Sequence, residues 1–312
     1  MFAAAMVLGL VIEAGLGWPN ALYMRIGHPI TWIGAAIAAC DTRFNRARDP
    51  DFARRAAGVA VTLALCGVVW GLAAALVWLL PGGWLGVVLT GILAWPLIAA
   101  RSLFTHVQAV ALPLGRGDLA GARVAVSMIV GRDPAQLDSA GVARAALESL
   151  GESTSDGVVA PLFWGVIFGL PGIAVYKVIN TMDSMVGHLS PRHAAFGWAP
   201  ARLDDLVNLI PARLSGLLIV AVSGRWQDSL ACMWRDAGKH RSPNAGWPEA
   251  ALAGALDVRL SGPRVYDGEV TQEPWVNDGA PDPTPQDLQR GLMVYLRVVV
   301  LLAAVMIVLA LI

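Results

Sequence analysis

The polar residues of the segment KVINTMDSMVGH, at 177–188, have types and a spacing that could act on a phosphate. On a helix, four of them would share one stripe and an aspartate would lie beside it. The four are Lys177, Asn180, Ser184 and His188, and the aspartate is Asp183. The other side of the helix would be apolar, with Val178, Ile179, Met182, Met185 and Val186. A lysine can neutralise a phosphate, and a carboxylate is a hard oxygen ligand for magnesium. An ordinary amphipathic helix with a solvated face explains the same spacing, and spacing alone favours that interpretation.

Three acidic residues come shortly before this segment, in LESLGESTSDG. Glu148, Glu152 and Asp156 are four residues apart and would share a helix face if the helix persists. Such a group repels itself unless a cation joins it, so the alternatives are a metal ion and simple solvation. An uncharged, apolar run follows directly, and ionisable residues at membrane depth are costly and usually functional.

Two segments downstream are also polar. In RLDDLVNLIPARL, Arg202–Asp205 and Asp205–Asn208 are i, i+3 pairs, which suit a salt-bridged surface helix as well as a metal site. In RDAGKHRSPNAGWPEAALAGAL, basic residues precede a helix that should begin near Pro248. This arrangement indicates either an anion site or a basic segment facing anionic lipid.

The composition indicates that a membrane holds the elements that position these residues. Hydrophobic residues make up 56% of the 312-residue chain and charged residues only 15%, against about 25% charged in soluble proteins. The net charge is zero, so no basic field points to nucleic acid. Three widely spaced cysteines indicate neither a disulfide framework nor a zinc site.

Apolar runs of about 20 residues predict an all-α polytopic integral membrane protein with a single membrane-embedded domain over 1–312. The four predicted transmembrane helices are 1–23, 56–80, 84–100 and 291–312. Two shorter or Gly- and Pro-interrupted runs, 158–176 and 207–224, are either re-entrant or spanning. The polar motifs occupy 101–290, where GRGD predicts a turn between helices and 258–287 reads as a loop.

The arginines predict the orientation of these helices. Six arginines between 25 and 55 place the loop after the first helix in the cytoplasm, and both chain ends outside. If the two shorter runs are re-entrant, the polar motifs between 101 and 290 face the cytoplasm. The polar residues gather outside the strong spans, which favours an enzyme over a transporter.

Four long motifs resemble one known family. ESTSDGVVAPLFW, YKVINTMDSMVGH, RLDDLVNLIPARL and SPNAGWPEAALAGAL occur in this order, with an early GHP and a central GRD. Over nearly the whole chain the sequence resembles the CobD/CbiB family, the adenosylcobinamide-phosphate synthases of cobalamin biosynthesis. It departs from that family at His188, where an aromatic residue is expected, and in a tail at 271–286 rich in proline and acid.

The resemblance implies a ligase of the bacterial inner membrane with its active site in the cytoplasm. The family joins aminopropanol, usually as its phosphate, to a carboxylate of adenosylcobyric acid, and this amide formation looks dependent on ATP and Mg²⁺. The implied partners are these substrates, the lipid bilayer and other enzymes of cobalamin biosynthesis. The alternatives are a membrane sensor of the AmpE type, a distant relative of the family, and a corrinoid carrier. The sequence does not predict the oligomeric state.

The chemistry of this reaction suggests roles for the polar residues. The predicted magnesium ligands are Glu152, Asp156 and Asp183. The predicted catalytic residues are Asp183, Lys177, Asp156 and His188, of which a carboxylate or the histidine would remove the proton of the amine. The predicted substrate-binding residues are Asn180, Ser184, Arg132, Arg202 and Asn244, with Trp164 and Trp247 against the corrin ring. Membrane-interface anchoring explains the tryptophans equally well.

Overall fold

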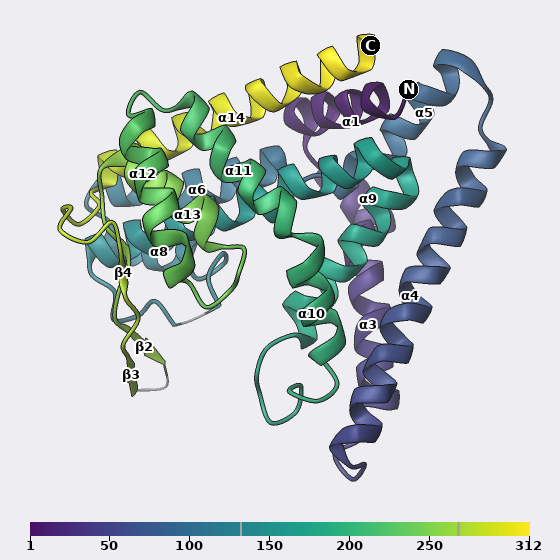
Figure 1. The fold of residues 1–312 in the computed structure, drawn as a ribbon, viewed down its shortest axis with the longest axis horizontal. Helices are drawn as coiled ribbons and strands as arrows, with labels where there is room; N and C mark the ends of the chain where they lie inside the picture. The colour runs from purple at the N-terminus through teal and green to yellow at the C-terminus, as the bar shows by residue number, and fades with distance from the viewer. Residues whose placement is uncertain (132, 267–268) are drawn as a thin grey trace. The chain divides into compact units, whose positions relative to one another are not determined.

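The chain folds almost entirely into helices, as the computed structural model in Figure 1 shows for residues 1–131, 133–266 and 269–312. The α-helices are α1 Phe2–Leu16, α2 Asn20–Ile26, α3 Pro29–Phe44, α4 Asp51–Leu79, α5 Gly83–Ala94, α6 Ala100–Gly115, α7 Leu119–Val126, α8 Ser139–Thr154, α9 Ala160–Val186, α10 Trp198–Val207, α11 Leu209–Val222, α12 Trp226–Asp236, α13 Gly246–Leu256 and α14 Pro285–Leu311. Short 3₁₀ turns are Trp95–Leu97 and Ala237–Lys239, and a π-helical turn is Ser155–Val159. The strands are β1 Leu260–Ser261, β2 Arg264–Tyr266, β3 Glu269–Thr271 and β4 Trp275–Val276.

Four helical stretches in the described residues are long and apolar enough to cross a membrane. They are Asp51–Leu79, Gly83–Gly115, Ser139–Val186 and Pro285–Leu311. Two bent helix pairs raise the number to six if each pair counts as one span. The predicted fold class, an all-α membrane protein with four spans and two further segments, is confirmed.

Three of these stretches overlap the predicted spans 56–80, 84–100 and 291–312, whereas the fourth, Ser139–Val186, contains the shorter run 158–176. The predicted span 1–23 is broken, because the chain turns at Gly17-Trp18-Pro19 and α1 meets the next helices at 108°. The arginine-rich segment that follows is largely helix α3 and not a loop. The predicted span 84–100 continues through the 3₁₀ turn at Pro96 into α6.

The two segments predicted as re-entrant or spanning also have clear local structure. The run 158–176 belongs to the stretch Ser139–Val186, but α9 is interrupted at Gly169, where φ is 66° and ψ is −151°. A side chain is strained at that φ, and a Cβ there would also lie 3.0 Å from the ring of Phe2. The run 207–224 lies largely in the bent pair of α10 and α11, whose axes differ by 46°.

The chain divides into two compact units, which are described separately below. Unit 1 contains residues 1–99, 160–208 and 305–312, and unit 2 contains 100–159 and 209–304. The single domain predicted over 1–312 concerns the chain as a whole and stays a prediction.

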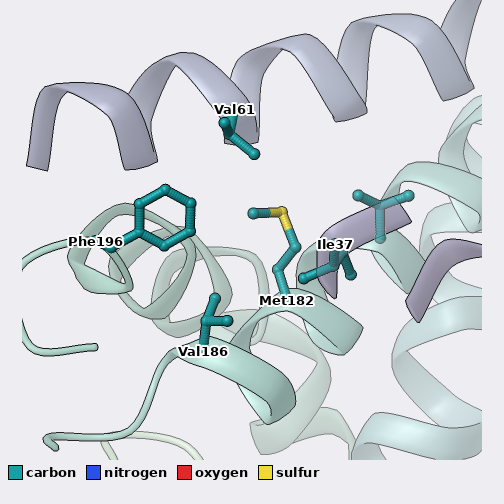
Figure 2. Close-up of a cluster of buried hydrophobic side chains, with 6 residues drawn as sticks. Ile37, Val61, Met182, Val186 and Phe196 are labelled. Atoms are coloured by element: carbon teal, nitrogen blue, oxygen red, sulfur yellow. The ribbon is translucent and has the colours of Figure 1, made fainter. Parts of the chain in front are cut away.

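The core of unit 1 lies where α3, α4 and α9 pack together. Figure 2 shows Met182 and Val186 of α9 beside Val61 of α4, Ile37 of α3 and Phe196. These five side chains are at most 7% exposed, so they form a closed apolar contact. The apolar side predicted for the segment 177–188 is therefore the buried side of α9, and its packing turns the polar stripe the other way.

The core of unit 2 surrounds α13, whose residues are nearly all buried and which contacts α8, α11 and α12. The segment 258–287 is not purely a loop, because β1 pairs with β4 and β2 with β3, both antiparallel. Asp282 fastens the acidic tail by ion pairs with Arg144 and Arg259. The hydrogen bond from Arg259 is the main reason that the pKa of Asp282 falls to about 2.

A second carboxylate, Asp236 at the end of α12, connects that helix to the segment 258–287 through hydrogen bonds. Its side chain is fully buried and bonds Arg235 Nη2 and Lys239 Nζ, each at 2.8 Å, and the backbone amide of Asn277 at 2.7 Å. Burial alone would raise the pKa of Asp236, but these bonds outweigh it and hold the pKa well below its usual range. These bonds therefore favour the charged form of Asp236 in the folded protein.

Replacing Asp236 with asparagine should destabilise the folded protein by about 3 kcal/mol at neutral pH, because two cations lose their buried partner. A carboxylate with a lowered folded pKa stabilises the protein above its unfolded pKa of about 4 and ceases to do so as the pH falls through the folded value. The wild type should thus lose stability below about pH 4, and Asp236→Asn should lose less over that range. Thermal unfolding followed by circular dichroism in detergent, as a function of pH, measures both effects.

The matched control is Asp228→Asn, which removes an exposed carboxylate that pairs with Arg225 on the same helix. An exposed pair contributes at most about 1 kcal/mol. Equal losses in the two variants would show that the buried position of Asp236 has no special weight.

Candidate functional site

A chain of hydrogen bonds in unit 1 joins the polar stripe of α9 to α10. Lys177 Nζ donates to Asn180 Oδ1 at 3.3 Å, and Asn180 Nδ2 donates to Asp204 Oδ1 at 3.5 Å. The other oxygen of Asp204 accepts from Asn208 Nδ2 at 2.9 Å. Tyr176 closes the chain by donating to Asn208 Oδ1 at 3.0 Å. The network therefore fixes side chains that are up to 32 residues apart in the sequence.

Burial separates this network from a solvated helix face. Tyr176 and Asn208 are at most 2% exposed, and Lys177 and Asp204 are 9% exposed. A long, strongly hydrated lysine is almost never buried unless it has a partner or a task. The interpretation of the stripe as an ordinary solvated face thus does not describe Lys177, although it suits the exposed Ser184, whose hydroxyl donates to the carbonyl of Asn180.

Three carboxylates gather near this network. The carboxylate of Asp183 lies close enough to those of Asp204 and Asp205, and to the imidazole of His188, to interact with them electrostatically. Arg202 is largely exposed and lies 3.7 Å from Asp205, so the predicted pair between them forms. Unit 1 therefore brings the predicted residues Lys177, Asn180 and Asp183 to one place, with further acids beside them.

The members of this site that the sequence analysis did not select as site residues are Tyr176, Asp204, Asp205 and Asn208. It paired Asn208 with Asp205 at i, i+3, whereas the structure bonds Asn208 to Asp204 at i, i+4. The four-residue spacing in RLDDLVN was the available signal. Two adjacent aspartates made that signal ambiguous, because which one faces α9 depends on the packing.

His188 is not on the predicted helical stripe. Helix α9 ends at Val186, and Gly187 and His188 follow in an irregular segment. The imidazole of His188 instead meets that of His193 edge to face at 5.5 Å. The ring is still within electrostatic reach of the Asp183 carboxylate, and the catalytic role of His188 stays a prediction.

The predicted acidic group of unit 2 does not form a simple face. Glu148 is buried and accepts a hydrogen bond from the amide of Ser261 at 2.8 Å, which is a structural role. Glu152 is exposed near the end of α8, while Asp156 lies in the π-helical turn Ser155–Val159. A π turn shifts the residues after it off the four-residue spacing, and such turns are frequent at functional sites.

The segment SPNAGW of unit 2 is held firmly against α8. A Cβ on Gly151 would lie 3.2 Å from the Cα of Glu249, so α8 and α13 approach closely there. Asn244 is buried just before α13. The indole of Trp247 donates to the carbonyl of Pro243 at 3.1 Å, and the guanidinium of Arg213 lies 4.4 Å above its ring. These contacts place the predicted residues Asn244 and Trp247 on a rigid element.

The basic residues before this segment pair with carboxylates of the same chain. Arg235 and Lys239 bond Asp236, as described above. Arg241 lies 3.2 Å from Glu273, and His240 Nε2 lies 3.6 Å from Glu249. Because each basic side chain faces a carboxylate of the protein, the arrangement does not favour the anion site considered for this cluster.

Trp164 has a structural task in unit 1. Its indole donates to the carbonyl of Val207 at 3.1 Å, and its ring stacks on Phe168 at 5.8 Å. Trp198 is 41% exposed, with the guanidinium of Arg55 5.0 Å from its ring. The predicted residue Arg132 lies outside the described residues.

The carboxylates of this site could bind magnesium in only some of the ways that proteins use. Among the described residues, no three His, Cys, Asp or Glu side chains are arranged to hold a metal ion by themselves. Magnesium usually keeps several waters and is bound by one or two carboxylates together with substrate phosphates. Asp183 and Asp205, whose carboxylates lie close enough to interact electrostatically, fit that mode of binding. The predicted ligands Glu152 and Asp156 belong to unit 2, so the complete set of three stays a prediction.

Comparison with known proteins supports the family resemblance that the four motifs indicate. The profile of the family described as CobD/Cbib protein matches residues 6–295. The chain is 62% identical over 297 residues to a protein of Rhodobacter capsulatus named cobalamin biosynthesis protein CobD, an alignment that covers 95% of this chain and 93% of the relative.

Proteins of the same name from Sinorhizobium sp and Brucella suis are 48% and 44% identical, over 93% and 92% of this chain and 92% and 90% of their own. No solved structure matches the chain. The matched range 6–295 includes residues of both units and all four motifs, and the chain belongs to the CobD/CbiB family.

Proposed function

We propose that the protein is an adenosylcobinamide-phosphate synthase, an ATP-dependent ligase of the bacterial inner membrane with a cytoplasmic active site. It would join aminopropanol or its phosphate to a carboxylate of adenosylcobyric acid. Membership of a family whose relatives are named for cobalamin biosynthesis supports this role. The observation that carries it is Lys177, a buried lysine whose hydrogen bond to Asn180 links it to the carboxylate of Asp204.

The reaction must first activate a poor acylating agent. In the proposed sequence, the carboxylate of adenosylcobyric acid attacks the γ-phosphorus of ATP, and ADP leaves. The resulting acyl phosphate is attacked by the amine, which loses a proton, and inorganic phosphate departs as the amide forms. Both steps depend on orientation and on neutralising phosphate charge, since there is little covalent chemistry for a side chain to perform.

The residues of unit 1 suit these tasks. Lys177 is held by Asn180 and would neutralise a transferred phosphoryl group. Asp183 and Asp205 would hold magnesium through one or two oxygens, and the metal when bound would screen the charge of the ATP phosphates. Asp183 or His188 would accept the proton of the amine. Asn180, Ser184 and Arg202 offer polar contacts that would orient the substrate.

Unit 2 would contribute binding groups of a different kind. Trp247 presents an aromatic face that Arg213 already covers in part, and Asn244 is fixed beside it. A corrin ring, with its apolar face and amide-edged rim, matches a rigid aromatic and amide surface of this type. Glu152 and Asp156 would supply further oxygen ligands to a cation.

The test is product formation by the purified full-length protein in membranes supplied with adenosylcobyric acid, aminopropanol phosphate, ATP and magnesium. Mass spectrometry should detect the amide product only when both ATP and magnesium are present. Replacing Asp183 with asparagine keeps the shape of the side chain but removes its charge, and should lower the rate by roughly 100-fold or more.

The exposed Asp51 supplies the matched control, because Asp51→Asn makes the same change far along the chain from the motifs. Its rate should stay within about twofold of the wild type. Binding of the corrinoid without product in any condition would replace the ligase with a carrier or sensor. Product formation by Asp183→Asn at the wild-type rate would retain the ligase but remove Asp183 from its machinery.

A further inference from the structure

A basic cavity in unit 2 lies outside the polar network of the proposed ligase. It has a volume of about 530 Å³ and is bounded by α14, the turn between α11 and α12, and the end of α13. Three arginines line it, namely Arg225, Arg290 and Arg297. Gln289 adds a polar wall, and Met293 and Leu256 add apolar ones. The cavity thus combines cationic and apolar surface.

The lining of this cavity carries positive charge only, because no carboxylate lines it among the described residues. Carboxylates outside the lining form ion pairs with two of the three arginines. Arg225 is held by Asp228 and Asp257 at 3.0 Å each, and Arg290 by Asp287 at 2.7 Å.

Arg297 is different, because it makes no ion pair or hydrogen bond within the part of the chain that the structure describes. Its guanidinium is exposed, so five donors are available to an outside acceptor. An anion with several oxygens would complete the arrangement.

The position of Arg297 along α14 indicates where that anion must lie. The whole of α14, Pro285–Leu311, is long and apolar enough to cross a membrane, so Arg297 lies within a membrane-spanning stretch. An arginine at that depth extends its side chain toward the lipid phosphates. Arg290 lies two turns earlier, further toward the aqueous side.

The face of α14 that carries these arginines also carries apolar residues that nothing in the structure covers. Arg290, Met293, Arg297 and Val300 follow at intervals of three and four, which is one helical stripe. Met293 is 53% exposed and Val300 is 68% exposed. A soluble anion would leave this apolar surface uncovered. A phospholipid would place its phosphate against the arginines and an acyl chain against Met293 and Val300.

We infer that this cavity binds the headgroup of an anionic phospholipid, whose phosphodiester contacts Arg290 and Arg297 while an acyl chain lies along α14. Basic pockets next to membrane helices bind such headgroups in general. The inference concerns a lipid and does not depend on the ligase reaction, so its test can succeed or fail independently of the proposed function.

The test is native mass spectrometry of the intact protein, titrated with phosphatidylglycerol or with phosphatidylcholine of the same acyl chains. The wild type should bind phosphatidylglycerol roughly tenfold or more tightly than phosphatidylcholine, and Arg290→Gln/Arg297→Gln should abolish this preference. Arg116→Gln, in an exposed turn of unit 2, is the matched control and should keep it. Equal binding of the two lipids by the wild type, or an unchanged preference in the double variant, would overturn the inference.

Two further arms separate the remaining outcomes. Inorganic phosphate in excess should not displace phosphatidylglycerol. If phosphate binds and only its binding is lost in the double variant, the cavity is a site for a soluble anion and the lipid is excluded. Should the double variant fail to fold, Arg297→Gln alone removes a side chain that makes no ion pair or hydrogen bond among the described residues, and Arg297→Lys should keep most of the preference because it keeps the charge.

Discussion

Replacing Lys177 with methionine should lower the rate of amide formation by about 100- to 1,000-fold, the usual effect of removing one preorganised group that stabilises a transition state. Methionine has nearly the length of lysine but no charge. The stability of the protein should change little or rise, because burying a charge is costly even when it is hydrogen-bonded. The measurements are the steady-state rate with ATP and magnesium in excess, and the thermal unfolding of the same preparation.

The chain offers an unusually direct control, because Lys239 is its only other lysine. Lys239 bonds Asp236 and the carbonyl of Trp275, so Lys239→Met should lower the unfolding temperature and leave the rate per folded molecule nearly unchanged. The two variants should thus show opposite patterns. A Lys177→Met enzyme that keeps its rate, or that loses rate only in proportion to unfolding, would exclude Lys177 from the chemistry.

Replacing Gly58 with alanine should destabilise unit 1 by about 3 kcal/mol, the upper end of the usual cost of overpacking. Gly58 lies on α4, and a Cβ there would stand 2.0 Å from the carbonyl oxygen of Phe196 and 2.9 Å from its carbonyl carbon. Backbone atoms cannot turn aside as a flexible side chain can, so α4 or the segment at Phe196 must move. That segment packs with Met182 and Val186, so the movement should also disturb the position of α9.

Gly67→Ala on the same helix is the matched control, because a Cβ there meets nothing within 4 Å. Alanine favours helix over glycine by up to about 1 kcal/mol, so this variant should be as stable as the wild type or slightly more. Thermal unfolding of both variants in one detergent measures the difference. Similar unfolding temperatures would mean that α4 and Phe196 are not in the close contact described here.

The polar stripe of α9 shows which features of a helix its sequence period predicts and which it does not. The 3.6-residue period assigned Lys177 and Asn180 to one side and Met182 and Val186 to the other, and both assignments are confirmed by burial and contact. It also extended the stripe to His188, although the helix ends two residues earlier. A period describes a helix only while the helix lasts, and the end at Gly187 depends on the packing of the segment that follows.

The membrane segments show the same limit. Length and apolarity predicted the number of spans and their class, because these are additive properties of a run of residues. They did not predict that 1–23 would break at Gly17-Trp18-Pro19, or that 84–100 would continue into α6. The positions of such breaks depend on how the neighbouring helices pack against the chain.

The sequence by itself determined the all-α membrane class, the polar and apolar sides of α9 and membership of the CobD/CbiB family, since each rests on composition, local period or motifs in order. Only the tertiary structure decided which polar groups meet. Asn180 reaches Asp204 across 24 residues, and Glu148 reaches Ser261 across 113, which makes the first pair part of the candidate site and the second a structural contact. The physical reason is that a side chain's partner depends on how distant helices pack, and no local spacing carries that information.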